Sequence, residues 1–208
     1  MKLFDNKQVG ITVVELLVAL TLSSIAILTI YSVFLSGVKV YQKIGIEGFL
    51  RDEADYVVSM IINEMNQSSV DIIKYCEATE NCIELIDSKQ INVNNDAKEL
   101  VGESEKETTV IIRFIINDTV VREVIEINKS KENETLTESS TLSSPNSTFT
   151  NSKIEILGIE EVYQQDLSET PMFKSAIINM NLQVGHSRYK EGSPLYVEPL
   201  QLESQFGF

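Results

Sequence analysis

The stretch that decides the fold is residues 7–37, KQVGITVVELLVALTLSSIAILTIYSVFLSG, near the start of a 208-residue chain. A short polar leader ends at Gly10, and an apolar run follows that is interrupted by one acid, Glu15. Residues 16–38 contain no charged side chain over 23 positions. As a helix this run is about 34 Å long, which is enough to cross a hydrocarbon core of roughly 30 Å. The sequence therefore predicts a membrane-spanning helix.

Glu15 is the unusual residue of this segment. An acid in a membrane helix costs about 2.5 to 3.5 kcal/mol at the helix centre on insertion scales, and less near an end. A carboxylate kept in that position is a functional-site hypothesis by default. A buried carboxylate is tolerated when an opposite charge is desolvated with it, so Glu15 needs a cationic partner.

A leader that ends in Gly10, followed by an apolar helix with Glu15 as its fifth residue, resembles the class III signal of type IV prepilins and type II secretion pseudopilins. The resemblance implies that a prepilin peptidase cuts after Gly10 and methylates the new N-terminus at Ile11. It also implies that Glu15 meets the N-terminal ammonium of a neighbouring subunit. The chain departs from the pattern in two places, since Ile11 replaces the commoner Phe and Asp5 places an acid in the leader.

The length and layout are most similar to the larger minor subunits, the W-type minor pilins and J-type pseudopilins. The resemblance implies a subunit of a type IV pilus-like or type II secretion filament that helps to initiate or cap it. Its partners would be other pilins or pseudopilins, the prepilin peptidase, the inner-membrane assembly platform and, before assembly, membrane lipid. The chain would cross the cytoplasmic membrane once, with its N-terminus in the cytoplasm and its C-terminal domain outside, and then join a cell-surface or periplasmic filament.

Two other functions stay open. One is a major pilin or an adhesive subunit. The other is a single-pass, membrane-anchored binding or sensor domain outside the cytoplasm, in which Glu15 is incidental. An ordinary secretory signal peptide is disfavoured, because its apolar core spans 7 to 15 residues and ends at a small-residue cleavage site. A buried core helix is disfavoured because it seldom lacks a polar face over such a length.

The formal net charge of −14 excludes some classes of partner. Lys2, Lys7 and Asp5 in the leader sum to one positive charge, which Glu15 cancels, so residues 39–208 carry the whole −14. Such a surface repels nucleic acid, and we expect no nucleic-acid binding by this subunit alone.

No enzyme signature is present, so we expect neither catalysis nor a cofactor. The chain lacks a nucleophile elbow, a phosphate loop, an HExxH motif and a Cys-x-x-Cys motif. Its single histidine, His186, is expected to be an exposed turn residue without an acid or nucleophile beside it. Asp52, Glu53 and Asp55 cluster in sequence and are expected to form a solvated helix face rather than a calcium site.

The two cysteines, Cys76 and Cys82, lie six residues apart in YCEATENCIEL. If the leader stays in the cytoplasm, this segment lies outside it, where disulfides persist. A disulfide would close a small loop and contribute about 2 kcal/mol on the loop-entropy model. Two free thiols remain the alternative. A metal site is disfavoured because only Glu77, Glu80 and His186 could complete it.

The remaining chain predicts an α+β fold, in which a long N-terminal helix packs on an antiparallel sheet. Residues 1–10 form the leader, 11–38 the transmembrane or filament-core helix, 39–69 its amphipathic continuation and 70–208 a β-rich head. The amphipathic part shows apolar residues at helical spacing, namely Leu50, Ala54, Val57, Val58, Ile61 and Met65. Strands are expected at 108–117 and 119–127, which form a hairpin, and at 153–163, 175–184 and 197–203.

Residues 128–152, NKSKENETLTESSTLSSPNSTFTNS, are rich in Ser, Thr and Asn. With few large apolar residues, this segment is not expected to bury enough surface to offset its ordering entropy. It is therefore expected to be a flexible loop, and a glycosylated or partner-binding loop is the alternative.

Overall fold

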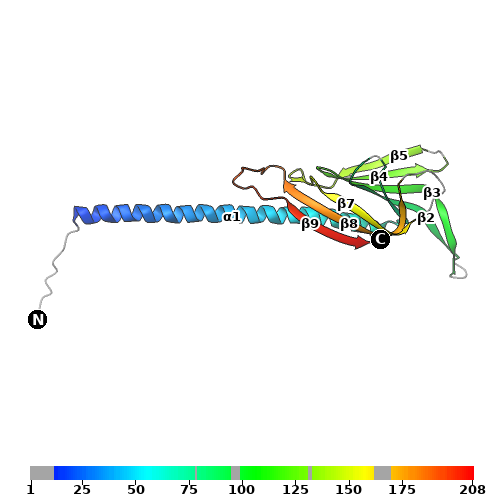
Figure 1. Ribbon diagram of the computed structural model, residues 1–208, viewed down its shortest axis with the longest axis horizontal. Helices are drawn as coiled ribbons and strands as arrows, with labels where there is room; N and C mark the ends of the chain where they lie inside the picture. The colour runs from blue at the N-terminus through cyan, green and yellow to red at the C-terminus, as the bar shows by residue number, and fades with distance from the viewer. Residues whose placement is uncertain (1–11, 78, 95–98, 131–132, 162–169) are drawn as a thin grey trace, which may run out of the picture. The chain divides into compact units, whose positions relative to one another are not determined.

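The computed structural model describes residues 12–77, 79–94, 99–130, 133–161 and 170–208 (Figure 1). The chain divides into two compact units, Met1–Ile44 and Gly45–Phe208. The helix α1 (Val13–Gln67) supplies the described secondary structure of the first unit and one element of the second.

In the first unit the helix leaves its apolar side chains uncovered. From Val13 to Ile44 its large apolar residues are exposed, and none of its most apolar 18-residue window is buried. Length and composition would allow this helix to span a membrane. The prediction of one apolar N-terminal helix is thus confirmed at this level.

The second unit has an α+β fold, which confirms the predicted fold class. Its sheet is antiparallel throughout the described pairings and follows the order β5-β4-β3-β2-β1-β8-β6, with β7 and β9 also paired to β8. The strands are β1 (Ile72–Tyr75), β2 (Cys82–Asn94), β3 (Glu99–Ile116), β4 (Val120–Asn128), β5 (Asn133–Thr141), β6 (Ser147–Thr148), β7 (Lys153–Glu161), β8 (Met172–His186) and β9 (Leu200–Gly207).

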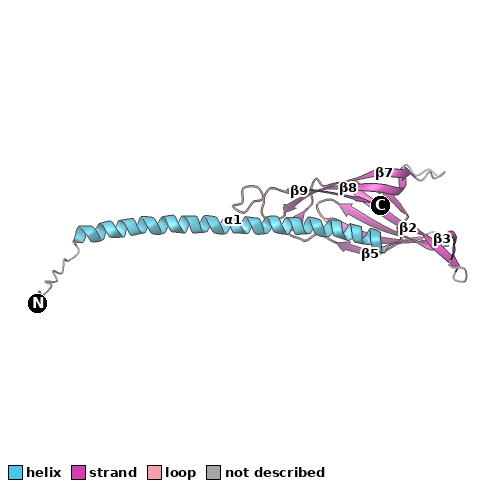
Figure 2. Cartoon of the chain, turned by 90° about the horizontal axis from the view of Figure 1, so that it is seen from below, coloured by secondary structure: helices cyan, strands magenta, loops and turns pink. Residues whose placement is uncertain are grey.

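The C-terminal part of α1 covers one face of this sheet (Figure 2). Its buried residues repeat at intervals of four, three and four positions, which places them on one stripe of the helix, namely Leu50, Ala54, Val57 and Ile61. They share a core with alternate residues of the strands, among them Leu85, Phe114 and Met180. The amphipathic prediction for this half of the helix is confirmed.

Two carboxylates of α1 form hydrogen bonds with β4 and with the segment at 144–147. Glu64 accepts a hydrogen bond of 2.7 Å from Nε of Arg122 on β4, and both side chains are about 15% exposed. Glu53 accepts hydrogen bonds from the backbone N–H of Ser144 at 2.9 Å and from the hydroxyl of Ser147 at 3.0 Å. Glu53 was expected on a solvated face, and this part of the expectation is wrong because its carboxylate turns toward backbone and hydroxyl donors.

The hairpin and the strand at 175–184 are found where they were expected. β3 and β4 pair from Thr108 with Asn128 to Ile116 with Val120. On β8 the alternating residues Ile178, Met180, Leu182 and Val184 are buried. The last strand begins at Leu200, three residues later than predicted, and Val197 is instead buried in the core outside any strand. Pro199 stands just before β9, where its missing N–H removes no ladder hydrogen bond.

The expectation of a flexible loop at 128–152 is wrong for the described part of this segment. It contains β5 and β6, and Phe149 is fully buried in the core. Three serines are buried as well, and each hydroxyl has a partner: Ser143 accepts from the N–H of Val120, Ser147 donates to Glu53, and Ser152 accepts from the N–H of Gln183. Small hydroxyl residues can be buried when they satisfy neighbouring polar groups, and composition does not reveal this.

Phe149 offers a test of this corrected segment. We expect Phe149→Ala to lower the free energy of unfolding by about 3 to 5 kcal/mol, because the variant leaves a cavity in the core. Ser139→Ala, at an exposed position of the same segment, should change it by less than about 0.5 kcal/mol. Urea unfolding of the full chain in detergent measures both values, and equal small effects would contradict a packed segment.

Candidate functional site

Glu15 lies in the first turn of α1, where it caps the helix. One oxygen of its carboxylate, Oε2, accepts hydrogen bonds from the backbone N–H and the hydroxyl of Thr12, both at 2.9 Å. The N–H of Glu15 donates in return to the Thr12 hydroxyl at 3.3 Å. This reciprocal pattern between Thr at the N-cap and Glu three residues later is a capping box. The sequence prediction did not include this role, although the spacing T-x-x-E contains its signal.

The other two residues of the predicted signal, Gly10 and Ile11, lie outside the described residues. Their cleavage and methylation therefore remain predictions. Glu15 itself is solvent-exposed in the isolated chain. Its second oxygen, Oε1, has no hydrogen-bond partner among the described residues, so the capping box leaves acceptor capacity for a cation from another molecule.

Cys76 and Cys82 are joined in a disulfide, with their Cα atoms 5.4 Å apart. Cys76 follows β1 and Cys82 begins β2, so the bond closes the connection between two paired strands. The backbone adds a further tie, because the N–H of Cys76 donates to the carbonyl of Cys82 at 3.2 Å. Asn81 has a φ of 51°, a left-handed conformation that Asn adopts more readily than most residues. The disulfide thus stabilises the turn between β1 and β2. No group of metal ligands is found in the part of the chain that the structure describes.

A row of charged residues crosses the sheet beside this disulfide. Lys74, Glu84, Arg113 and Glu123 are paired in register on β1 to β4. The buried carboxylate of Glu84 receives two hydrogen bonds from Arg113, at 2.7 and 2.9 Å, and lies 3.3 Å from the Lys74 ammonium. Burial lowers the pKa of Arg113, but the hydrogen bonds and charge of Glu84 outweigh it and raise that pKa. Lys74, Glu84 and Arg113 line, together with Ile111, a hollow of about 330 Å³. Each of these three charged groups is already in an ion pair with another described residue.

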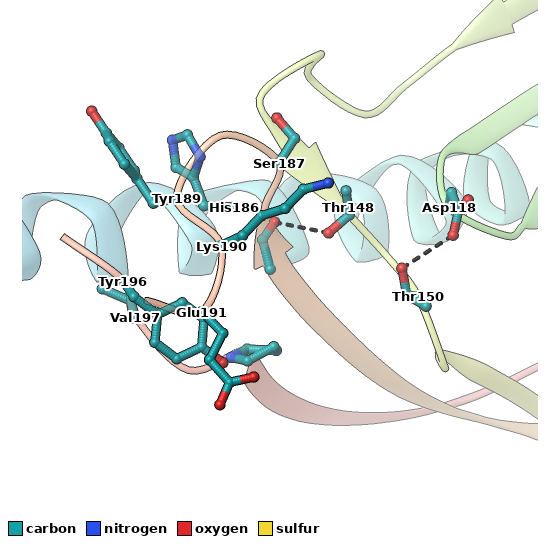
Figure 3. A pocket seen from close by; sticks show the side chains of 12 residues that line it. Asp118, Thr148, Thr150, His186, Ser187, Tyr189, Lys190, Glu191, Tyr196 and Val197 are labelled. Atoms are coloured by element: carbon teal, nitrogen blue, oxygen red, sulfur yellow. Dashed lines mark hydrogen bonds between the residues drawn. The ribbon is translucent and has the colours of Figure 1, made fainter. Parts of the chain in front are cut away.

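A second hollow lies at the end of β8 (Figure 3). It encloses about 470 Å³ between the loop at 187–199 on one side and the start of β4 with β6 on the other. The hydroxyl of Thr150 donates to Asp118 at 3.1 Å, and the hydroxyl of Thr148 donates to the carbonyl of Gly185 at 3.3 Å. Both hydrogen bonds are drawn as dashed lines in Figure 3. The loop contributes two tyrosines, one lysine and one glutamate, namely Tyr189, Tyr196, Lys190 and Glu191.

His186 forms part of this groove and is more enclosed than the sequence predicted. It is the last residue of β8, pairs with Ser147 and is half-buried, so the expectation of an exposed turn residue is wrong. Its ring lies 4.6 Å from the ring of Tyr189 and 5.9 Å from that of Phe49, measured between centroids. Burial and the positive charge of Arg188 lower the pKa of His186. The N–H of Arg188 also donates to Nδ1 at 3.1 Å, which requires an unprotonated Nδ1.

No local sequence pattern indicated the groove, because its residues come from three separate places in the chain. The turn before β4, the segment at 148–150, and the stretch from the end of β8 through the loop before β9 have no common spacing in sequence. Among the described residues, the His186 side chain has one hydrogen bond, from the N–H of Arg188, and no nucleophile is bonded to it.

The disulfide can be tested on the folded protein. In wild type we expect neither Cys76 nor Cys82 to react with an alkylating reagent until a reductant is added. The double variant Cys76→Ser with Cys82→Ser should lose about 2 kcal/mol of unfolding free energy, because the unfolded chain gains loop entropy. Mass spectrometry with and without reductant decides the first point. Full alkylation of both thiols under oxidising conditions would contradict the bond.

The lowered pKa of His186 predicts a pH dependence with a definite sign. Below its ordinary pKa of about 6.5 the unfolded chain binds a proton that the folded chain resists, so His186 destabilises the fold as the pH falls. His186→Asn can still accept the N–H of Arg188 but carries no charge. From about pH 7.5 to about pH 5, wild type should therefore lose more unfolding free energy than this variant. Equal losses would contradict the argument.

Comparison with known proteins does not indicate a function for this chain. No family model, no curated protein and no solved structure matches the chain. What the protein does is therefore argued from its own residues.

Proposed function

We propose that the chain is a pilin-like subunit, anchored by α1 and built into an envelope filament as a minor pilin or pseudopilin. One observation carries the proposal: a helix with an uncharged stretch at 16–38 and one carboxylate at its start leaves its apolar side chains uncovered. Such a helix needs a membrane or other apolar helices around it. A prepilin, which residues 1–38 resemble, would have both in turn: the membrane before assembly and the helices of neighbouring subunits in the filament.

Glu15 would then have two roles that are separable. The capping box uses one oxygen of the carboxylate and depends on its hydrogen-bonding geometry. Pairing with the ammonium of a neighbour's N-terminus depends on its charge and becomes stronger in a medium of low dielectric constant. Glutamine can replace glutamate in a capping box but carries no charge. Glu15→Gln therefore removes the assembly interaction while it retains the cap.

The groove at the end of β8 favours a second function, that of a membrane-anchored binding module. It combines aromatic rings with free polar groups, as ligand sites commonly do. In that case Glu15 would cap the helix and nothing more, and the loss of its charge would leave function intact. The two functions thus differ in what they predict for a single substitution.

The experiment follows the chain in cells that carry the assembly machinery and its peptidase. We expect the mature protein to begin at Ile11, which N-terminal mass spectrometry detects. Glu15→Gln should be present at the wild-type level but should co-purify with partner subunits severalfold less, because only the charge is lost. Thr12→Ala, which removes a member of the cap but no charge, is the matched control and should be recruited better than Glu15→Gln.

Two results would overturn the proposal. An intact leader in cells with an active peptidase would remove the basis of the resemblance. Wild-type recruitment of both Glu15→Gln and Glu15→Ala would leave the carboxylate with its capping role only, and the binding module would then be the better function.

A further inference from the structure

Two lysines stand at the end of the apolar part of α1. Lys39 and Lys43 are the first charged residues after the uncharged stretch at 16–38, and they are four positions apart. Residues at this spacing lie on the same face of a helix, about one turn apart. Lys39 is exposed and Lys43 is half-buried. Among the residues that the structure describes, neither lysine has an ion pair or a side-chain hydrogen bond.

The residues around the two lysines remain apolar and uncovered. Val40, Tyr41 and Ile44 are each more than half exposed. The stretch at 16–38 is about 34 Å long as a helix and fills a hydrocarbon core of roughly 30 Å. Residues 39–44 extend about 9 Å further, which covers a headgroup layer of about 5 to 7 Å. When this helix spans a bilayer, the two ammonium groups therefore lie beside the lipid phosphates.

The two lysines have the opposite charge to the rest of the chain beyond them. Residues 39–208 sum to −14, so residues 45–208, which follow the lysines and Ile44, carry −16. The first acid along the helix is Glu47, about 12 Å from Lys39 along the axis. This distance exceeds the Debye length of about 8 Å at physiological ionic strength. Along the helix, the lysines are thus the nearest and least screened charges for the headgroups.

We propose that Lys39 and Lys43 form a binding site for an anionic phospholipid, in which their ammonium groups donate to the lipid phosphate. An ammonium has three N–H donors and no acceptor, and a charged phosphate oxygen is a strong acceptor for it. The lysine stems can lie along apolar surface while the ammonium reaches the headgroup. A lysine near an anionic bilayer surface favours association by a factor of about five.

The site would offset a repulsion that the net charge creates. A strongly acidic chain is repelled by an anionic bilayer. The lysine pair supplies a local attraction at the point where the helix leaves the hydrocarbon core. The inference rests on the membrane anchorage that the proposed function includes, and it does not require assembly of a filament.

The test uses the full chain in vesicles of phosphatidylcholine that contain a minor fraction of phosphatidylglycerol, an anionic lipid. The chain has no tryptophan, so Tyr41→Trp provides a single fluorescent reporter between the two lysines. Bromine atoms on the acyl chains near the headgroup quench a tryptophan that they touch. Brominated phosphatidylglycerol should quench the reporter severalfold more than the same amount of brominated phosphatidylcholine. Added salt should reduce this difference, because it screens the attraction.

Matched variants in the Tyr41→Trp background identify the lysines. Lys39→Gln combined with Lys43→Gln should abolish the preference for phosphatidylglycerol. Lys39→Arg combined with Lys43→Arg should retain it, because arginine keeps the charge. Lys153→Gln combined with Lys174→Gln removes the same two charges from exposed positions of β7 and β8 and should leave the preference unchanged.

Flotation with the vesicles and resistance to alkaline extraction distinguish two kinds of failure. A chain that does not insert would contradict the membrane anchorage, and the lipid site with it. A chain that inserts but is quenched equally by the two brominated lipids would overturn the lipid site alone. The same conclusion would follow if the preference survived both glutamine substitutions at positions 39 and 43.

Discussion

The contact between the C-terminal part of α1 and the inner face of the sheet is the interaction on which the rest of the second unit depends. Leu50, Ala54, Val57 and Ile61 fill the space above alternating strand residues and are almost fully buried. Full burial of a Leu, Val or Ile side chain contributes about 1.5 to 3 kcal/mol. Without the helix the inner face of the sheet would be exposed to water, and the strands would lose the surface that fixes their register.

Carboxylates determine how this contact is oriented. Glu64 pairs with Arg122, and Glu53 receives two hydrogen bonds from the segment around Ser147. Both acids lie at the border of the apolar stripe, where they are part-buried and meet donors from distant parts of the chain. A protein with a net charge of −14 thus uses some of its acids to hold its own parts together.

The Glu15 carboxylate is compatible with two roles, a helix cap and a charge that pairs with a neighbouring subunit. In the isolated chain its geometry is that of a helix cap. In an assembled state its charge would be the relevant property. Local structure alone does not choose between these roles, because the cap occupies one oxygen and leaves the other available. The difference between glutamate and glutamine separates the two roles because only the charge changes.

The sequence by itself determined the apolar helix, the amphipathic continuation, the β3–β4 hairpin and the alternating strand β8, since each depends on a local repeat of 3.6 or 2 residues. Only the tertiary structure decided that residues 133–152 form strands and buried contacts, that Glu53 turns inward, and that a groove forms around His186. In each of these cases the partners are distant in sequence. Ser147 lies 94 residues from Glu53, and the groove gathers three separate segments. Burial of polar side chains depends on such distant partners, which no local pattern contains.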